Sequence, residues 1–173
     1  NMFAELGVPI YNADVEAKKL TASSKIIRKK LIALLGEETF KNGLLDRKYM
    51  AEKIFSDKDL LQATNEIIHP EVAEHFKTWL SQQNTAYIIK EAAIIFESGT
   101  HSQYDLVILV TAPKKVRLDR VMSRDNATEM EVGQRMANQW SDAKKEQLAD
   151  IIIKNVDLEA TRLQVETIHS QLR

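Results

Sequence analysis

Gly7-Val-Pro-Ile-Tyr-Asn-Ala-Asp14 is the most informative segment of this sequence for the fold. An apolar run ends at Tyr11, and after Asn-Ala-Asp a helical pattern begins at Val15. This pattern predicts a short parallel strand whose carboxyl end presents one acid, Asp14, at a helix start. Ligands of open α/β sheets bind outside the carboxyl ends of the strands, so Asp14 is a candidate for chemistry. The alternative role for the same carboxylate is the N-cap of the helix.

The composition is that of an ordinary soluble globular protein. Its 173 residues fit one domain with a sizeable core. The formal charge of −1, from 24 basic and 25 acidic residues, gives no electrostatic case for nucleic acid or an anionic membrane as partner. The sequence has no cysteine, which excludes a disulfide scaffold and a Cys-ligated metal. This composition is consistent with a reducing compartment, and we expect a cytoplasmic protein.

Short apolar segments alternate with longer amphipathic helices, the pattern of a parallel sheet covered on both faces. The crossover at residues 15–82 is far longer than a βαβ unit needs, so part of it is expected to form a helical subdomain. Pro70 in this block is predicted to lie in the first turn of a helix, where its missing N–H has no partner to lose. Residues 113–149 are predicted to hold two or three helices with Gly133 inside one of them, which suits a mobile lid. The expected strands are residues 8–11, 86–90, 106–111 and 151–154.

Several further motifs follow in order along the chain. They are Leu45-Asp-Arg47, Ile67-Ile-His-Pro70, Ile94-Ile-Phe-Glu-Ser-Gly99, Leu118-Asp-Arg-Val-Met-Ser-Arg-Asp125 and Ala149-Asp-Ile-Ile-Ile-Lys-Asn155. In this order and at these separations, the chain resembles the dephospho-coenzyme A kinase family from residue 1 to about residue 172. The resemblance implies ATP-dependent phosphorylation of the ribose 3′-hydroxyl of dephospho-coenzyme A, the last step of coenzyme A synthesis, with Mg²⁺ as cofactor.

The resemblance also implies the architecture. We expect a three-layer α/β fold of the P-loop kinase type, with a parallel sheet. The expected core comprises residues 1–24, 84–112 and 150–173. A helical insertion at about residues 25–82 would bind the acceptor, and residues 113–149 would form the lid.

Some features depart from the family's pattern. The family opens with a strand and a loop of the form G-x-x-x-x-G-K-[ST], and none of the five glycines lies in such a pattern. Residues 2–6 look like the back half of a helix ended by Gly7, and in the family this helix follows the phosphate loop. We therefore expect the natural protein to carry roughly twenty more N-terminal residues, enough for one strand and a phosphate loop. Asn12 stands where the family usually has Asp, and Ala93 where a proline is common.

Phosphoryl transfer depends on positioning and charge neutralisation rather than on covalent help from the protein. With the resemblance, Asp14 is expected to accept the proton of the ribose hydroxyl. Arg120 and Arg124 lie one helical turn apart and are expected to form forked hydrogen bonds to phosphate oxygens as the lid closes. Arg135 would add a third guanidinium. The alternative for all three arginines is a surface ion pair with a neighbouring acid.

Five further residues complete the set of candidate site residues. Glu91, at the end of a predicted strand, is expected to hold a water on Mg²⁺. His69, Arg47 and Glu97 are assigned to the acceptor. A turn residue bonded to backbone is the alternative for His69, and a role in orienting loops is the alternative for Glu97. Asn155 is expected to bond the adenine edge, although a turn-forming asparagine explains it equally well.

Two other functions stay open at this stage. One is another P-loop kinase of small nucleosides or nucleotides, and the other is a non-catalytic nucleotide- or coenzyme A-binding protein that lacks the phosphate loop. The expected partners are ATP and dephospho-coenzyme A, with no nucleic acid and no membrane, and the expected state is a monomer or weak homo-oligomer. The basic run at residues 25–30 is interpreted as a solvated helix face.

Overall fold

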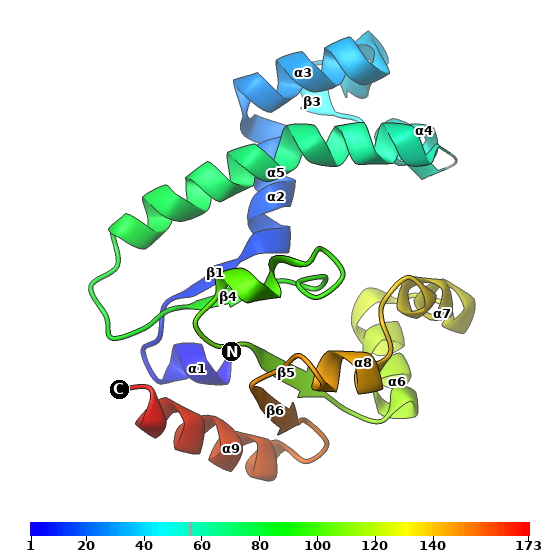
Figure 1. The fold of residues 1–173 in the computed structure, drawn as a ribbon. Helices are drawn as coiled ribbons and strands as arrows, with labels where there is room; N and C mark the ends of the chain where they lie inside the picture. The colour runs from blue at the N-terminus through cyan, green and yellow to red at the C-terminus, as the bar shows by residue number, and fades with distance from the viewer. Residues whose placement is uncertain (56) are drawn as a thin grey trace. The chain divides into compact units, whose positions relative to one another are not determined.

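The computed structural model describes residues 1–55 and 57–173 and divides into two compact units, which are described separately. Unit 1 comprises Asn1–Val8 and Ala93–Arg173, and unit 2 comprises Pro9–Ala92. Figure 1 shows the course of the chain through both units. The second compact unit contains two strands as well as the helical block. The boundaries expected for the acceptor-binding insertion and for the lid therefore remain predictions.

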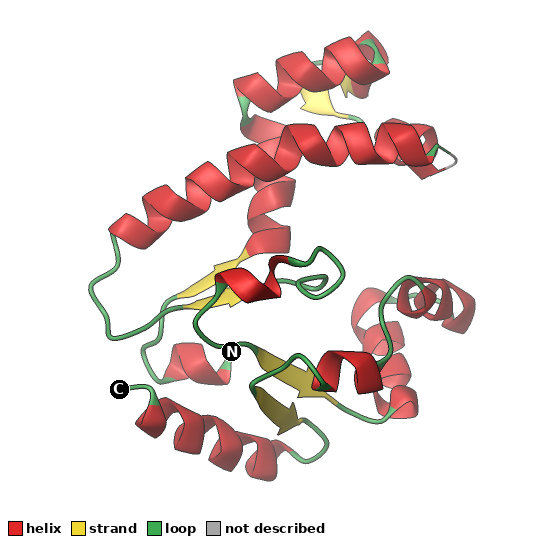
Figure 2. Cartoon of the chain, in the orientation of Figure 1, coloured by secondary structure: helices red, strands yellow, loops and turns green. Residues whose placement is uncertain are grey.

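Unit 2 is built on two parallel strands and the helical block between them. Strand β1 (Ile10–Asn12) pairs with β4 (Ile89–Glu91), and Asn12 lies opposite Glu91 in the register. Figure 2 shows that most of the chain between these strands is helical. It forms α2 (Ala13–Ser23), α3 (Lys25–Leu35), the 3₁₀ helix η1 (Glu37–Thr39), β2 (Phe40–Lys41), β3 (Leu44–Leu45), α4 (Arg47–Phe55) and α5 (Lys58–Ser81).

The core of unit 2 lies along one face of α3. Ile27, Leu31 and Leu35 recur every fourth residue, so they form an apolar stripe, and all three are buried together with Phe40. Ser24 begins the helix by accepting a hydrogen bond from the N–H of Ile27 at 3.2 Å on its Oγ. Local sequence therefore sets both the start of α3 and the face that it buries.

A short hairpin interrupts the block that was predicted to be helical. β2 and β3 pair antiparallel, and the turn between them is Asn42-Gly43. Both turn residues have positive φ, 51° and 83°, as a two-residue hairpin turn requires. The two-residue strands are too short to show an alternating pattern, so the sequence signalled only a break here.

The helix start predicted at Pro70 is wrong. Helix α5 runs unbroken from Lys58 to Ser81 with Pro70 inside it, and His69 is therefore a helical residue and not a turn residue. A proline inside a helix costs about 3 kcal/mol. Helix α5 packs against α2, α3 and α4 and buries Thr64 and Val72. A fully buried apolar side chain contributes roughly 1.5–3 kcal/mol, so Val72, together with the partly buried Leu60, Ile67 and Ile68 that pack on the core, offsets the cost of the proline.

Unit 1 is built on a second pair of parallel strands. β5 (Ile108–Thr111) pairs with β6 (Ile151–Lys154) in parallel. Ile153 of β6 is buried with Val165 and Ile168 of the C-terminal helix α9. The helical elements of this unit are α1 (Met2–Glu5), the 3₁₀ helix η2 (Thr100–Gln103), α6 (Lys114–Asp125), α7 (Glu129–Ala137), α8 (Asp142–Glu146) and α9 (Leu158–Gln171).

The four predicted strands are all present, with changed bounds for three of them. β6 matches its prediction, whereas β1 starts two residues later than predicted. The first ladder bond runs from the N–H of Ile89 to the carbonyl of Pro9 at 3.0 Å, so pairing with the partner strand decides where β1 begins. Residues 113–149 form three helices with Gly133 inside α7, as predicted. Gly7 follows α1 at a φ of 81°, which confirms it as the helix-ending residue.

Candidate active site

The carboxyl ends of β1 and β4 bring two acids to one edge of unit 2. Glu91 is the last residue of β4 and lies opposite Asn12 in the register, and Asp14 follows Asn12 by two residues, in the first turn of α2. Both Asp14 and Glu91 are exposed. The pairing of the strands therefore places one carboxylate from each strand end where α/β sheets bind ligands.

Asn12, and not Asp14, is the N-cap of α2. Its Oδ1 accepts a hydrogen bond from the N–H of Val15 at 2.9 Å. The capping alternative for Asp14 is therefore wrong. Asp14 occupies the second helical position, in the first turn of α2.

Tyr11 fixes the strand that carries this edge. The residue is 2% exposed, and its hydroxyl lies 3.3 Å from the carbonyl of Val72 and 3.0 Å from His75 Nδ1, both on α5. Its ring contacts the rings of Phe76 and Trp79, with centroids 4.9 and 5.3 Å apart. Burial, with a smaller effect from Glu16, raises the pKa of Tyr11 to about 12, so the phenol stays neutral. Sequence reasoning missed this anchor, since its partners are more than sixty positions away along the chain.

His69 and Arg47 lie on other elements of the same unit. His69 is exposed on α5, and Arg47 is the exposed first residue of α4. Next to Arg47, Asp46 accepts a hydrogen bond from the N–H of Tyr49 at 2.9 Å and pairs with Lys41 at 3.0 Å. These two contacts hold the pKa of Asp46 below its ordinary value. The assignment of His69 and Arg47 to the acceptor stays a prediction.

Glu97 belongs to a largely buried polar cluster of unit 1. Its Oε1 accepts hydrogen bonds from Lys145 Nζ at 2.9 Å and from the N–H of Trp140 at 2.8 Å. Burial alone would raise the pKa of Glu97, but these hydrogen bonds outweigh burial and hold the pKa below its ordinary value. Lys145 is itself only 7% exposed. This geometry favours the loop-orienting role for Glu97 over contact with the acceptor.

The segment that leads into α8 has further contacts. Arg117 of α6 donates a hydrogen bond to Asp142 at 2.6 Å, and Lys144 Nζ lies 3.2 Å from the centroid of the Trp140 ring. With the Glu97 contacts, these bonds attach the start of α8 both to the loop after β4 and to α6. We did not anticipate Lys145 or Asp142 from the sequence, because their spacing to these partners carries no local pattern.

The three candidate arginines have two different kinds of partner. Arg124 donates to the carboxylate of Asp125 from Nε at 2.7 Å, and Arg135 donates to the same carboxylate at 2.9 Å. Arg120 instead donates from Nη1 to the carbonyl of Asn155 at 2.7 Å and from Nη2 to the carbonyl of Val156 at 3.1 Å. Surface pairing with a neighbouring acid thus describes Arg124 and Arg135, whereas Arg120 binds the backbone of Asn155, another predicted site residue, and of Val156.

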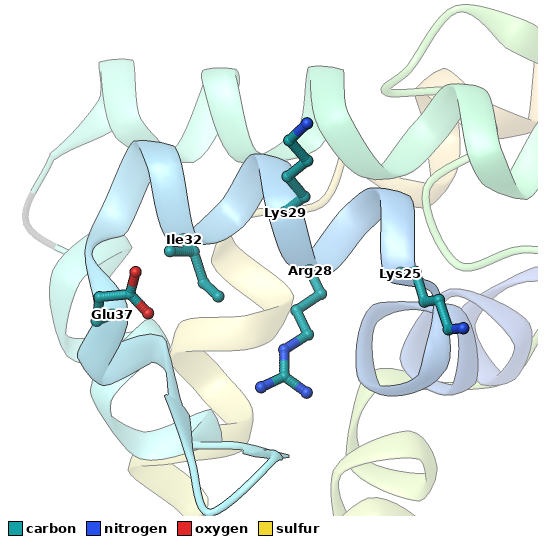
Figure 3. Close-up of a pocket in the computed structure, with 5 residues that line it drawn as sticks. All are labelled: Lys25, Arg28, Lys29, Ile32 and Glu37. Carbon is teal, nitrogen blue, oxygen red and sulfur yellow. The ribbon is translucent and has the colours of Figure 1, made fainter.

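The basic run of α3 lines a hollow of about 340 Å³ with Ile32 and Glu37. Figure 3 shows that its cations diverge, with Lys29 pointing away from Arg28 and Lys25 pointing in a third direction. Arg28 is already engaged, since its Nη1 donates to the carbonyl of Gly43 at 3.2 Å and its guanidinium lies over the Phe40 ring. The arrangement favours a solvated helix face, as expected.

Residues 1–55 and 57–173 contain neither a cluster of metal-binding side chains nor a helix that could span a membrane. No group of three or more His, Asp or Glu side chains in this part of the chain is placed to hold a metal ion. Within the same residues, no helix has the length and apolar character needed to cross a membrane.

Both the sequence and the fold are similar to those of known proteins. A family model described as dephospho-CoA kinase matches residues 1–160. A dephospho-CoA kinase of Bacteroides fragilis is 40% identical over 87% of this chain and 74% of the relative, and one of Porphyromonas gingivalis is 42% identical over 78% and 66%. A crystal structure from Thermus thermophilus matches with a TM-score of 0.90 and 25% identity, over 99% of this chain and 88% of that chain. A dephospho-CoA kinase from Campylobacter jejuni matches with a TM-score of 0.67 and 26% identity, over 97% and 87%.

The α/β fold, with its parallel strands and several helices, is that of a small-molecule kinase of the P-loop kinase class. The chain belongs to the dephospho-coenzyme A kinase family. The predicted fold class and the resemblance stated from the sequence are therefore confirmed. Neither a kinase of other nucleosides nor a non-catalytic binding protein is favoured by these relatives.

Proposed function

We infer that this protein transfers the terminal phosphoryl group of ATP to the ribose 3′-hydroxyl of dephospho-coenzyme A, giving coenzyme A and ADP. The observation that carries this inference is the pair of acids at the ends of β1 and β4 in a chain of this family. The proposed place of action is the cytoplasm, since the cysteine-free composition suits a reducing compartment. The proposed state is a monomer or a weak homo-oligomer.

Asp14 is the proposed proton acceptor. The ribose 3′-oxygen attacks the terminal phosphorus, its proton passes to a carboxylate oxygen of Asp14, and the bond to the leaving oxygen of ADP breaks. This carboxylate lies in the first turn of α2, and the capping role of Asn12 leaves the helix end intact around it. Tyr11, immediately before Asn12, anchors the strand to α5 and so limits movement of the base.

The residues at this edge also fit Mg²⁺. This ion binds through oxygen ligands, commonly one or two carboxylates together with waters and substrate phosphates. Glu91 supplies an exposed carboxylate at the strand end beside Asp14, and substrate and water would complete the coordination. Glu91 is the proposed holder of a metal-bound water. When bound, Mg²⁺ would neutralise negative charge on the phosphates.

The proposed lid arginines are Arg124 and Arg135. Both hold Asp125 on an exposed surface of α6 and α7, and the carboxylate keeps the two guanidinium groups together. Phosphate oxygens accept the same forked hydrogen bonds that a carboxylate accepts. We propose that closing of the lid exchanges Asp125 for phosphate oxygens. Asn155, at the end of β6, is proposed to read the adenine edge.

The function is tested by acceptor choice and by ligand mapping on the protein. Given ATP, the enzyme should phosphorylate dephospho-coenzyme A in preference to adenosine or AMP, with products identified by mass spectrometry. In hydrogen exchange, dephospho-coenzyme A alone should protect residues 25–82, and a non-hydrolysable ATP analogue should protect residues 113–149. Preferred phosphorylation of adenosine or AMP would overturn the acceptor assignment, and the opposite protection pattern would overturn the assigned regions.

Arg124→Ala should slow phosphoryl transfer much more than it weakens ATP binding. A guanidinium that neutralises charge developing in the transition state acts on turnover, and losing one such donor raises the barrier by about 2–4 kcal/mol. Single-turnover rates at saturating ATP should therefore fall by roughly 30- to 1,000-fold. Arg162→Ala is the matched control, because Arg162 forms an exposed pair with Glu5 on α9 and α1. If Arg124→Ala reaches the parent rate at saturation, Arg124 is only a surface charge.

A further inference from the structure

We propose that Arg120 determines nucleobase selectivity by holding the loop between β6 and α9, and that it does not act chiefly by neutralising phosphate charge. This inference rests on the proposed function, because it takes Asn155 as the residue that reads the base. The inference is based on two hydrogen bonds that the Arg120 guanidinium donates to the carbonyls of Asn155 and Val156, at 2.7 and 3.1 Å.

The two bonds use the Arg120 fork in a specific way. Its two terminal nitrogens donate to two successive carbonyls, so one planar group fixes the orientation of two peptide units. An ammonium group is a point charge without this fixed fork, and a lysine at this position would not hold both carbonyls in the same geometry. The partners of Arg124 and Arg135 are different, since both bind the exposed carboxylate of Asp125.

The same loop is fixed from its other sides. The N–H of Asn155 donates to the carbonyl of Thr111 at 2.8 Å and so continues the ladder between β6 and β5. Asp157 caps α9 by accepting a hydrogen bond from the N–H of Ala160 at 2.8 Å. With the carbonyl of Asn155 held by Arg120, the backbone of Asn155 is fully engaged. The side-chain amide of Asn155 is therefore the group that would bind a ligand. Arg120 helps to set the position of this amide by holding the backbone.

Arg120 also joins the base-reading loop to the helix that carries Arg124. Both arginines lie on α6, one turn apart, but only Arg120 reaches the β6–α9 loop. A base that fits the loop would therefore stabilise the contact between that loop and α6. In this way one side chain links recognition of the base to the position of the proposed lid.

The test compares ATP with GTP in the parent and in Arg120→Ala, Arg120→Lys, Arg124→Ala and Asn155→Ala. Hydrogen bonds to a charged group contribute about 1.5–3 kcal/mol, and 1.4 kcal/mol is tenfold. We expect Arg120→Ala to lower the ATP-to-GTP ratio of kcat/KM by about tenfold or more. Arg120→Lys should lower the ratio nearly as much although it keeps the charge. Arg124→Ala should slow both nucleotides equally and leave the ratio unchanged.

Two further measurements make the result decisive. The double variant Arg120→Ala/Asn155→Ala should be no less selective than Asn155→Ala alone, because both changes remove the same recognition. Dissociation constants for ATP and GTP, measured by calorimetry without acceptor, should show the same loss of selectivity, so a wrong acceptor assignment would leave this test intact. If Arg120→Ala slows both nucleotides equally and Arg120→Lys restores turnover, Arg120 is a phosphate-neutralising residue and this inference is wrong.

Discussion

Asp14→Asn is expected to lower turnover by about a hundredfold or more while ATP still binds, the usual scale for the loss of a general base. The amide has nearly the shape of the carboxylate but does not accept the ribose proton. Because Asn12 caps α2, the substitution leaves the helix start intact, and the loss should appear in kcat and not in the free energy of unfolding. Single-turnover phosphorylation of dephospho-coenzyme A at saturating ATP measures it directly.

Asp59→Asn is a closely matched control for this experiment. Asp59 is the second helical residue of α5 and follows the N-cap Asp57, just as Asp14 is the second helical residue of α2 and follows the N-cap Asn12. Both variants remove one exposed first-turn acid from unit 2, so they share the change in charge and in helix-dipole interaction. Only Asp14→Asn should lose turnover. Equal activities in the two variants would reduce Asp14 to a surface acid and remove it from the mechanism.

Lys145→Met is expected to lower the free energy of unfolding by about 3–5 kcal/mol, the scale for removing one partner of a buried ion pair. The substitution removes the Lys145 ammonium from the carboxylate of Glu97, which stays in a largely buried site where the N–H of Trp140 still donates to Oε1. Lys144→Met is the control, because Lys144 is exposed and its contact with Trp140 is worth about 1 kcal/mol. Urea unfolding at neutral pH provides the comparison.

The pH dependence of this loss has a definite sign. The pKa of Glu97 lies below its ordinary value of 4.5 in the folded protein, so the pair contributes stability above that value and loses it as the pH falls through the lowered pKa. The deficit of Lys145→Met should therefore shrink in acid. The double variant Lys145→Met/Glu97→Gln should recover part of the loss at neutral pH, because it removes the unpaired charge. A deficit that is independent of pH and of Glu97 would assign the loss to packing alone.

The family and most of the helices and strands could be predicted from the amino-acid sequence. The apolar runs located the strands, and the acid after residues 8–11 located the base candidate, because both signals are local to a few neighbouring residues. The strand ends at Glu91 and Asn155 were likewise predicted, and pairing of β1 with β4 placed Glu91 beside the edge that carries Asp14. The prediction failed where packing overrode a local preference, as at Pro70 inside α5.

The contacts of the polar side chains, in contrast, became apparent only in the folded structure. Tyr11 binds His75, Arg120 binds the loop at Asn155, and Glu97 binds the N–H of Trp140, across 64, 35 and 43 positions of the chain. No periodicity or spacing encodes such pairs, because each depends on how separate elements pack and on which donors burial leaves within reach of an acceptor. The sequence therefore predicted which residues lie at the ends of strands and on one face of a helix. Packing determined which of them orient the site and which remain to meet a ligand.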